Sequence, residues 1–196
     1  MTLDELAAVI ERGGVVAVPT DTVYGLACHP DRADAAERIF AIKQRPPDME
    51  LSLLGAARDD LVRFGELDGL AERLAERFWP GPLSIIVPLK PPRHPAIPRH
   101  GDTISLRVPA SEPLRGLLRI TGPLATTSAN RHGQPPASTA QEVSVILAAE
   151  IDGILDGGPA AGRASTIIDC SVTPARVLRT GPLGDAELSP YLEGSC

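Results

Sequence analysis

Aromatic residues and cysteines are scarce in this chain of 196 residues. Phe, Trp and Tyr make up 3% of the sequence, so aliphatic side chains must form most of the hydrophobic core. The three cysteines, Cys28, Cys170 and Cys196, stand far apart and form no CxxC pair, and the four histidines show no metal-ligand spacing. The sequence therefore indicates neither a disulfide framework nor a metal site.

The sequence also lacks a long apolar run and an excess of positive charge. No stretch approaches the roughly 20 apolar residues that span a bilayer, and residues 1–5 have no basic region like that of a secretory signal. We therefore expect no membrane association and a cytoplasmic location. The formal net charge of −6 argues against nucleic-acid binding through a broad basic surface. The nucleotide-binding patterns GxxxxGK[ST] and GxGxxG are absent as well.

Short apolar segments alternate with segments of helical periodicity along the chain. Thr2 and Glu5, and again Thr139 and Glu142, have the spacing of a capping box, which predicts a helix start at each place. We expect helices at about residues 2–12, 34–44, 67–78 and 139–149, a short helix after Ser111, and strands at 15–18, 51–54, 83–89, 103–108, 124–127, 151–155, 166–169 and 175–179. This order predicts a single α/β domain over residues 1–196, built around a mostly buried sheet.

Small polar residues follow two of the predicted strands. Thr20, Asp21 and Thr22 come after the first strand, and Ser128 and Asn130 come after the strand at 124–127. Ligands of α/β proteins usually bind at the ends of strands, and exposed backbone N–H groups there can hold a phosphate or a ribose. Taken alone, each segment also fits an ordinary hydrogen-bonded turn.

Three cations stand where an anion could bind. Lys43 and Arg45 end the second predicted helix, and Pro46 turns the chain so that both could reach phosphate oxygens. The alternative is a favourable charge at a helix C-terminus, worth roughly 0.3–1 kcal/mol. Arg107 interrupts an apolar strand, and a buried charge is costly unless it is paired. We therefore expect either a ligand anion or a structural carboxylate beside Arg107.

The order of these segments resembles a known family. The segments are PTDTVYGL at 19–26, KxR at 43–45, PGPLS at 80–84, SLRVP at 105–109, TSAN at 127–130 and STIID at 165–169. In this order they resemble the YrdC-like threonylcarbamoyl-AMP synthase family, in its short, single-domain form. The resemblance covers about residues 6–182 and leaves 183–196 as an expected C-terminal tail.

The resemblance implies a twisted, mixed sheet flanked by helices, with a concave basic cavity for ATP and L-threonine. It implies a nucleotidyltransferase, an L-threonylcarbamoyladenylate synthase. In this reaction the amine of threonine takes up bicarbonate as a carbamate, which attacks the α-phosphorus of ATP and expels pyrophosphate, with Mg²⁺ assisting. The product would serve the N6-threonylcarbamoyladenosine modification of tRNA, with tRNA and a downstream threonylcarbamoyltransferase complex as further partners.

The resemblance also implies which residues bind each substrate. The residues implied for ATP are Lys43, Arg45, Ser128, Asn130 and Arg179, of which Lys43 and Arg45 would be catalytic because they neutralise the triphosphate. The residues implied for L-threonine are Thr20, Thr22, Tyr24, Arg107 and Ser165.

One segment departs from the family. After KxR and three further residues, the family continues Lys-Pro-Leu. This chain has Met49, Glu50 and Leu51 at those positions, so the family's Lys and Pro are replaced. Losing one charge-assisted contact costs about 1.5–3 kcal/mol, or roughly tenfold to more than a hundredfold in affinity. Either Arg58 or Arg163 compensates from another loop, or the chain is a YrdC-like paralogue with weakened catalysis that acts as an RNA-binding module.

Overall fold

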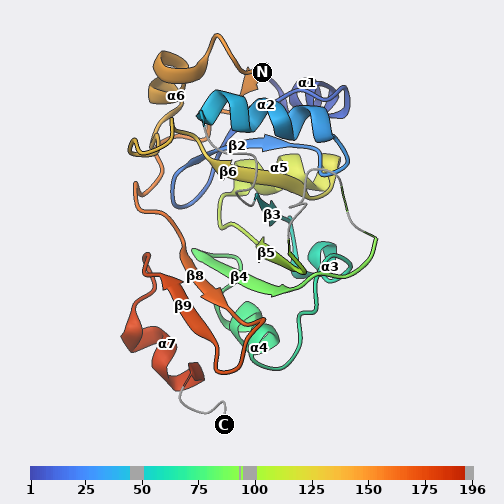
Figure 1. Ribbon diagram of the computed structural model, residues 1–196. Helices are drawn as coiled ribbons and strands as arrows, with labels where there is room; N and C mark the ends of the chain where they lie inside the picture. Colours follow the sequence, from blue (N-terminus) through green and yellow to red (C-terminus); the bar gives the residue numbers. More distant parts are fainter. Residues whose placement is uncertain (45–50, 93, 95–100, 193–196) are drawn as a thin grey trace.

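The computed structural model describes residues 1–44, 51–92, 94 and 101–192, and within them nine strands form one sheet (Figure 1). In sheet order the strands are β7 (Gly153–Ile154), β1 (Val16–Pro19), β2 (Tyr24–Cys28), β6 (Leu124–Ser128), β3 (Ser52–Leu54), β5 (Thr103–Arg107), β4 (Leu83–Pro88), β8 (Thr166–Asp169) and β9 (Arg176–Arg179). The pairs β7/β1, β3/β5 and β4/β8 are parallel and the other neighbours are antiparallel, so the predicted mixed sheet is confirmed.

Seven helices in the described residues flank this sheet. They are α1 (Leu3–Glu11), α2 (Ala33–Lys43), α3 (Arg58–Leu61), α4 (Gly69–Phe78), α5 (Glu112–Thr121), α6 (Ala140–Leu147) and α7 (Asp185–Leu192). Both predicted helix starts are confirmed, because the Thr2 and Thr139 side chains accept from the N–H groups of Glu5 and Glu142. Among these helices, none combines the length and apolar character needed to cross a bilayer.

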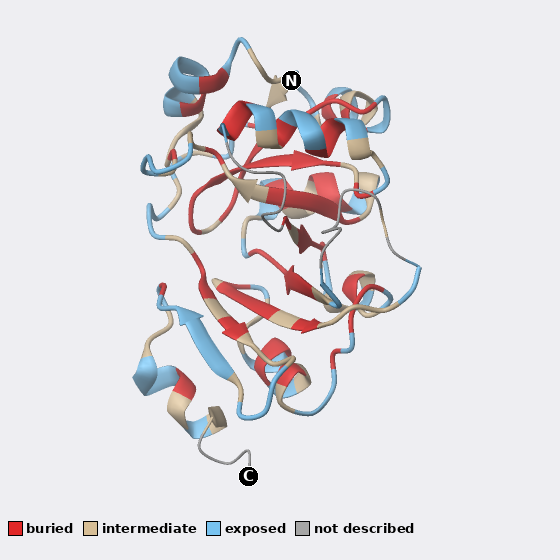
Figure 2. Ribbon diagram, viewed as in Figure 1, coloured by how far each residue is buried: buried red, intermediate tan, exposed pale blue. Residues whose placement is uncertain are grey.

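The strand register divides the side chains between two faces of the sheet. Leu53 lies opposite Ala125 and Leu54 lies opposite Leu124, and successive residues of a strand point to opposite sides. The face with Leu53 and Ala125 packs under α2 and α6 at one end and under α3 and α4 at the other. The face with Leu54 and Leu124 packs under α1 and α5, which cover only its β1–β2–β6 end. Figure 2 shows the buried strands in the middle of the sheet and the exposed edge strand β9.

Three elements were not expected from the sequence. Strand β2 follows the polar residues 20–22 directly and is buried throughout, but its five residues do not alternate in polarity. Helix α3 has only four residues, too few to show a helical period. Helix α7 lies in the segment expected as a tail and buries Leu188, although Pro190 interrupts its sequence pattern.

Candidate functional site

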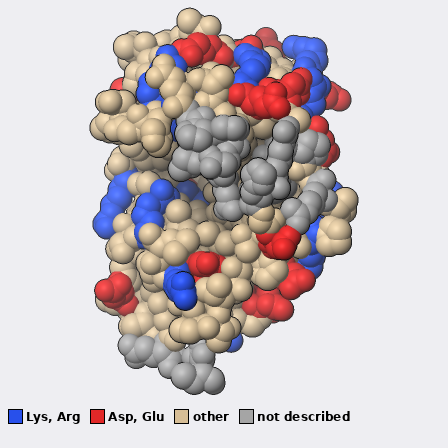
Figure 3. Space-filling view, in the orientation of Figure 1, with Lys and Arg blue, Asp and Glu red and all other residues tan. Residues whose placement is uncertain are grey.

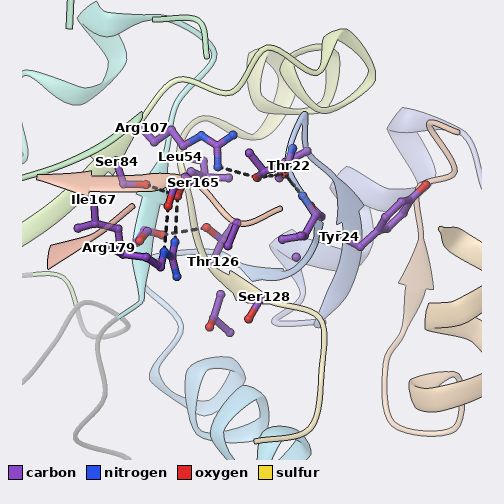
Figure 4. Close-up of a pocket in the computed structure, with 16 residues that line it drawn as sticks. Thr22, Tyr24, Leu54, Ser84, Arg107, Thr126, Ser128, Ser165, Ile167 and Arg179 are labelled. Carbon is purple, nitrogen blue, oxygen red and sulfur yellow. Dashed lines mark hydrogen bonds between the residues drawn. The ribbon is translucent and has the colours of Figure 1, made fainter. Parts of the chain in front are cut away.

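A pocket of about 230 Å³ opens on the sheet face that α1 and α5 leave uncovered (Figure 4). Its lining comes from seven strands and two loops: Thr20, Thr22, Val23, Tyr24, Gly25, Ser52, Leu54, Ser84, Arg107, Thr126, Thr127, Ser128, Ala164, Ser165, Ile167 and Arg179. Among the described lining residues the cations are Arg107 and Arg179, and none is a carboxylate, so the pocket is positive in a chain of net charge −6. Figure 3 shows Lys and Arg side chains gathered at mid-height on the left of the molecule.

The register of the strands explains the polar floor of this pocket. Ser52 lies opposite Thr126 across β3 and β6, and on the same face the neighbouring strand β5 ends in Arg107. Along β5, Ser105 and Arg107 alternate with Ile104 and Leu106, and along β3 and β6 the hydroxyls of Ser52 and Thr126 lie on the same face as Leu54 and Leu124. The floor is therefore built from strands far apart in the sequence.

The turn after β1 is fixed by its own threonines. Thr20 Oγ1 lies 2.9 Å from Thr22 Oγ1 and donates to the Val23 carbonyl at 2.6 Å, while the N–H groups of Thr22 and Val23 donate back to Thr20 Oγ1. Both threonine side chains are buried. The turn thus presents Thr22 to the pocket in one defined orientation, which is the hydrogen-bonded turn that the sequence also allowed.

Arg107 is held in the pocket wall by three partners. Its Nε donates to the Gly81 carbonyl at 2.9 Å and its Nη1 to Thr22 Oγ1 at 3.0 Å. Its Nη2 forms an ion pair of 2.6 Å with Asp21 Oδ1, which also accepts from the Ala110 N–H. Burial lowers the pKa of Arg107, and the Asp21 carboxylate raises it. Of the two partners expected for this buried charge, the structure shows the structural carboxylate, and contact with a ligand anion stays a prediction.

A second polar chain crosses the pocket floor between β4, β8 and β9. The hydroxyls of Ser84 and Ser165 lie 2.9 Å apart, and Arg179 donates through Nε to the Ser165 carbonyl and through Nη2 to its hydroxyl. Gly181 allows this approach, because a Cβ there would lie 2.4 Å from the Ala164 carbonyl oxygen. Ser165 and Arg179 are therefore fixed relative to each other.

Lys43 lies behind the pocket wall, and its ammonium group points into the turn after β6. It donates to the Ser128 carbonyl at 2.5 Å, the Asn130 carbonyl at 3.0 Å and Asn130 Oδ1 at 2.8 Å. Lys43 is only 2% exposed and does not line the pocket. Its geometry is that of a residue that shapes the turn, and its contact with phosphate stays a prediction.

Asn130 and Tyr24 also direct their polar groups away from the cavity. The Asn130 amide donates to the carbonyls of Arg131 and Gln134, and its oxygen accepts from Ser128 Oγ at 2.6 Å. The Tyr24 hydroxyl donates to the Gly158 carbonyl at 2.9 Å, and Figure 4 shows the ring pointing away from the other labelled residues. Tyr24 therefore lines the pocket without presenting its hydroxyl to it, and Asn130 lies behind the pocket.

The structure thus brings most of the predicted site residues together. Thr20, Thr22, Tyr24, Arg107, Ser128, Ser165 and Arg179 line one pocket, with Lys43 and Asn130 directly behind it. Arg45, Met49 and Glu50 lie outside the described residues. Arg58, considered as a substitute cation, pairs with Glu72 of α4.

Four hydroxyl residues that line the pocket were not expected there from the sequence. They are Ser52, Ser84, Thr126 and Thr127. The sequence held only a weak signal for these residues. Ser52 and Thr126 stand two positions before Leu54 and Ser128, and Ser84 is the last residue of the PGPLS segment. Within the described part of the chain, no group of three or more His, Cys, Asp or Glu side chains is placed to hold a metal ion.

Known proteins are similar to this chain over most of its length. The Sua5/YciO/YrdC family model, described as "Telomere recombination", matches residues 8–181. A threonylcarbamoyl-AMP synthase of Pyrococcus abyssi (strain GE5/Orsay) is 38% identical over 189 residues, which are 95% of this chain and 56% of that protein. One of Bacillus subtilis (strain 168) is 36% identical over 195 residues, 96% of this chain and 56% of that protein. This chain therefore spans little more than half the length of these relatives.

Solved structures share the fold. Sua5 of P. abyssi complexed with L-threonine superposes with a TM-score of 0.92 at 35% identity, over 98% of this chain and 57% of that one. Escherichia coli YciO superposes with a TM-score of 0.88 at 27% identity, over 97% of this chain and 92% of that one. The predicted α/β fold is confirmed.

Proposed function

Because the chain belongs to the Sua5/YciO/YrdC family, we propose that it is an L-threonylcarbamoyladenylate synthase that uses ATP, L-threonine and bicarbonate. The observation that carries this proposal is the positive, hydroxyl-lined pocket in a fold that superposes on a relative complexed with L-threonine. The names of the curated relatives support the same activity.

The threonine end of the site would lie at Arg107. Gly81, Thr22 and Asp21 take three of the five N–H donors of its guanidinium and fix its plane. A guanidinium fixed in this way suits a planar carboxylate, because the two groups can form parallel hydrogen bonds. Ser165 would contribute a hydroxyl from the loop before β8.

The nucleotide end would lie between Ser128 and Arg179. Ser128 lines the pocket at the end of β6, and Arg179 reaches it from β9. In this proposal Lys43 and Asn130 hold the Ser128 turn in place, and Arg45 extends the positive charge toward the triphosphate. Mg²⁺ would arrive with ATP, bound to its phosphate oxygens, as is usual for this ion.

The chemistry then needs positioning and charge neutralisation. Threonine's amine and bicarbonate form a carbamate with loss of water, a carbamate oxygen bonds to the α-phosphorus, and the bond to pyrophosphate breaks. The pocket would hold the carbamate and the α-phosphate next to each other, while its cations offset the charge on the leaving group. We further propose a cytoplasmic enzyme whose product passes to a tRNA threonylcarbamoyltransferase complex.

The test is a search by mass spectrometry for threonylcarbamoyl-AMP after incubation with all three substrates. We expect the adenylate and an equal amount of pyrophosphate, and neither when ATP, threonine or bicarbonate is omitted. Absence of the adenylate under all conditions would contradict the proposal. Salt-dependent RNA binding without turnover would instead support the non-catalytic RNA-binding module.

A further inference from the structure

The C-terminal end of α2 is capped by residues that follow Ser128. An α-helix leaves its last carbonyl groups without partners inside the helix. The Ile42 carbonyl accepts from Arg131 Nη1 at 2.5 Å. The Lys43 carbonyl accepts from the His132 N–H at 2.8 Å. The turn after β6 therefore completes the hydrogen bonding of α2 from outside.

Arg131 is itself held by Glu150, which follows α6. Nη1 of Arg131 lies 2.9 Å from Glu150 Oε2, and Nη2 pairs with Oε1, so the two planar groups form a bidentate ion pair. The same Arg131 nitrogen that bonds Glu150 Oε2 also bonds the Ile42 carbonyl. The carboxylate of Glu150 thus fixes the direction in which Arg131 reaches α2.

Lys43 connects the same two segments from the inside. Its side chain leaves the end of α2 and donates to Ser128 and Asn130, whereas Arg131 leaves the turn and donates to α2. The side chains of Lys43 and Arg131 therefore join α2 and the turn after β6 in opposite directions, one from each segment. Ser128 lies within this link and lines the pocket, whereas Arg131 and Glu150 do not line it.

We propose that Arg131, oriented by Glu150, is a positioning residue for the nucleotide end of the pocket. It sets the Ser128 turn relative to the end of α2 without contacting the substrate, and this role rests on the proposed function. The two side chains are 29% and 36% exposed, and an ion pair of this kind contributes little to global stability. Small displacements of a binding group nonetheless weaken binding strongly.

The experiment compares two arginine variants that each lose one bidentate ion pair. Arg131→Gln removes the link to Ile42 and Glu150. Arg32→Gln is the matched control, because Arg32 forms a bidentate ion pair with Asp34 and donates to the Glu11 carbonyl, at the opposite end of α2 from the turn. For the full chain, calorimetry gives the dissociation constants of ATP and of L-threonine, and hydrogen exchange gives the protection of residues 128–134.

We expect Arg131→Gln to raise the dissociation constant of ATP about tenfold and leave that of L-threonine within about twofold, because Arg107 lies on the other side of the pocket. Exchange at residues 128–134 should be faster. Arg131→Lys should recover part of both effects, and Arg32→Gln should show neither. Wild-type ATP affinity with unchanged exchange, or an equal loss of both ligands, would overturn the inference.

The same experiment distinguishes an error in the proposed function from an error in the positioning role. If the wild-type chain binds neither ATP nor L-threonine, the synthase proposal falls. Hydrogen exchange then decides the positioning role alone: faster exchange in Arg131→Gln than in Arg32→Gln supports it, and equal exchange refutes it.

Discussion

The two ends of one sheet face have opposite character, although strands β2, β3 and β6 contribute residues to both. At the β1–β2 end, Val16, Val18 and Ala27 pack under α1 and α5 with Leu124 and Leu54. Beyond Leu54 the same face carries serines, threonines and arginines and remains open as the pocket. We therefore expect one end to contribute mainly to folding stability and the other, under the proposed function, mainly to binding.

Leu54 marks the boundary, since it belongs to the apolar cluster and also lines the pocket. Substitutions at sites that share no contacts usually have additive effects on the free energy of unfolding. Stability and ligand affinity should therefore be separable by choosing residues on either side of Leu54.

The largest effect is expected at the open end, for Arg107→Met. The change removes one partner of a buried ion pair and leaves Asp21 without its cation, which costs about 3–5 kcal/mol of unfolding free energy. Threonine affinity should fall about a hundredfold or more, since a charge-assisted contact is lost. Urea denaturation and calorimetry at low temperature measure the two effects. Unchanged threonine binding by the folded variant would remove Arg107 from the site.

At the packed end, Leu117→Ala should cost about 2–5 kcal/mol, because Leu117 of α5 is fully buried and its loss leaves a cavity. Ligand affinity of the folded fraction should stay the same. The matched control is Ile120→Ala in the same helix, where the side chain is 50% exposed and the cost should be below about 0.5 kcal/mol. A loss of ATP or threonine affinity in Leu117→Ala would show that the two ends are coupled.

The contrast between the ends could be foreseen only in part. Local patterns predicted the capped helices and most strands, and the cost of an unpaired buried charge predicted a partner for Arg107. The polar floor could not be predicted, because Ser52 meets Ser105 and Thr126 through a strand register that residues distant in sequence determine. The position of Lys43 near Ser128 follows from the family resemblance, but the direction of its ammonium group follows from side-chain packing alone.

A smaller effect at the open end is expected for Ser84→Ala. The variant loses one buried hydrogen bond, to Ser165, at a cost of about 1 kcal/mol. Threonine affinity should fall several-fold, because Ser165 loses one of its two side-chain partners. Ser105→Ala is the matched control: its hydroxyl pairs with Ser52 over the same 2.9 Å, but Ser105 does not line the pocket. Equal threonine affinity in the two variants would argue against a binding role for Ser165.

The smallest effect is expected beside the packed end, where Asp152 accepts from the Val15 N–H and from Arg38. The hydrogen bond from Arg38 holds the pKa of Asp152 below its usual value of about 3.9. The ion pair therefore stabilises the fold above about pH 4 and loses this effect as the pH falls through the lower, folded-state pKa. Both side chains are more than a third exposed, so the contribution should stay below about 1 kcal/mol.

Urea denaturation of the wild type and of Asp152→Asn between pH 6 and pH 2 measures this contribution. The difference in unfolding free energy should be constant near neutral pH and shrink in acid, because the protonated carboxyl and the amide are then both uncharged. Threonine affinity at neutral pH should be the same in both proteins, since Asp152 lies outside the pocket. If the difference in unfolding free energy persists at pH 2, Asp152 stabilises the fold through its hydrogen bond with the Val15 N–H. The charge of Asp152 would then contribute nothing to the stability of the packed end.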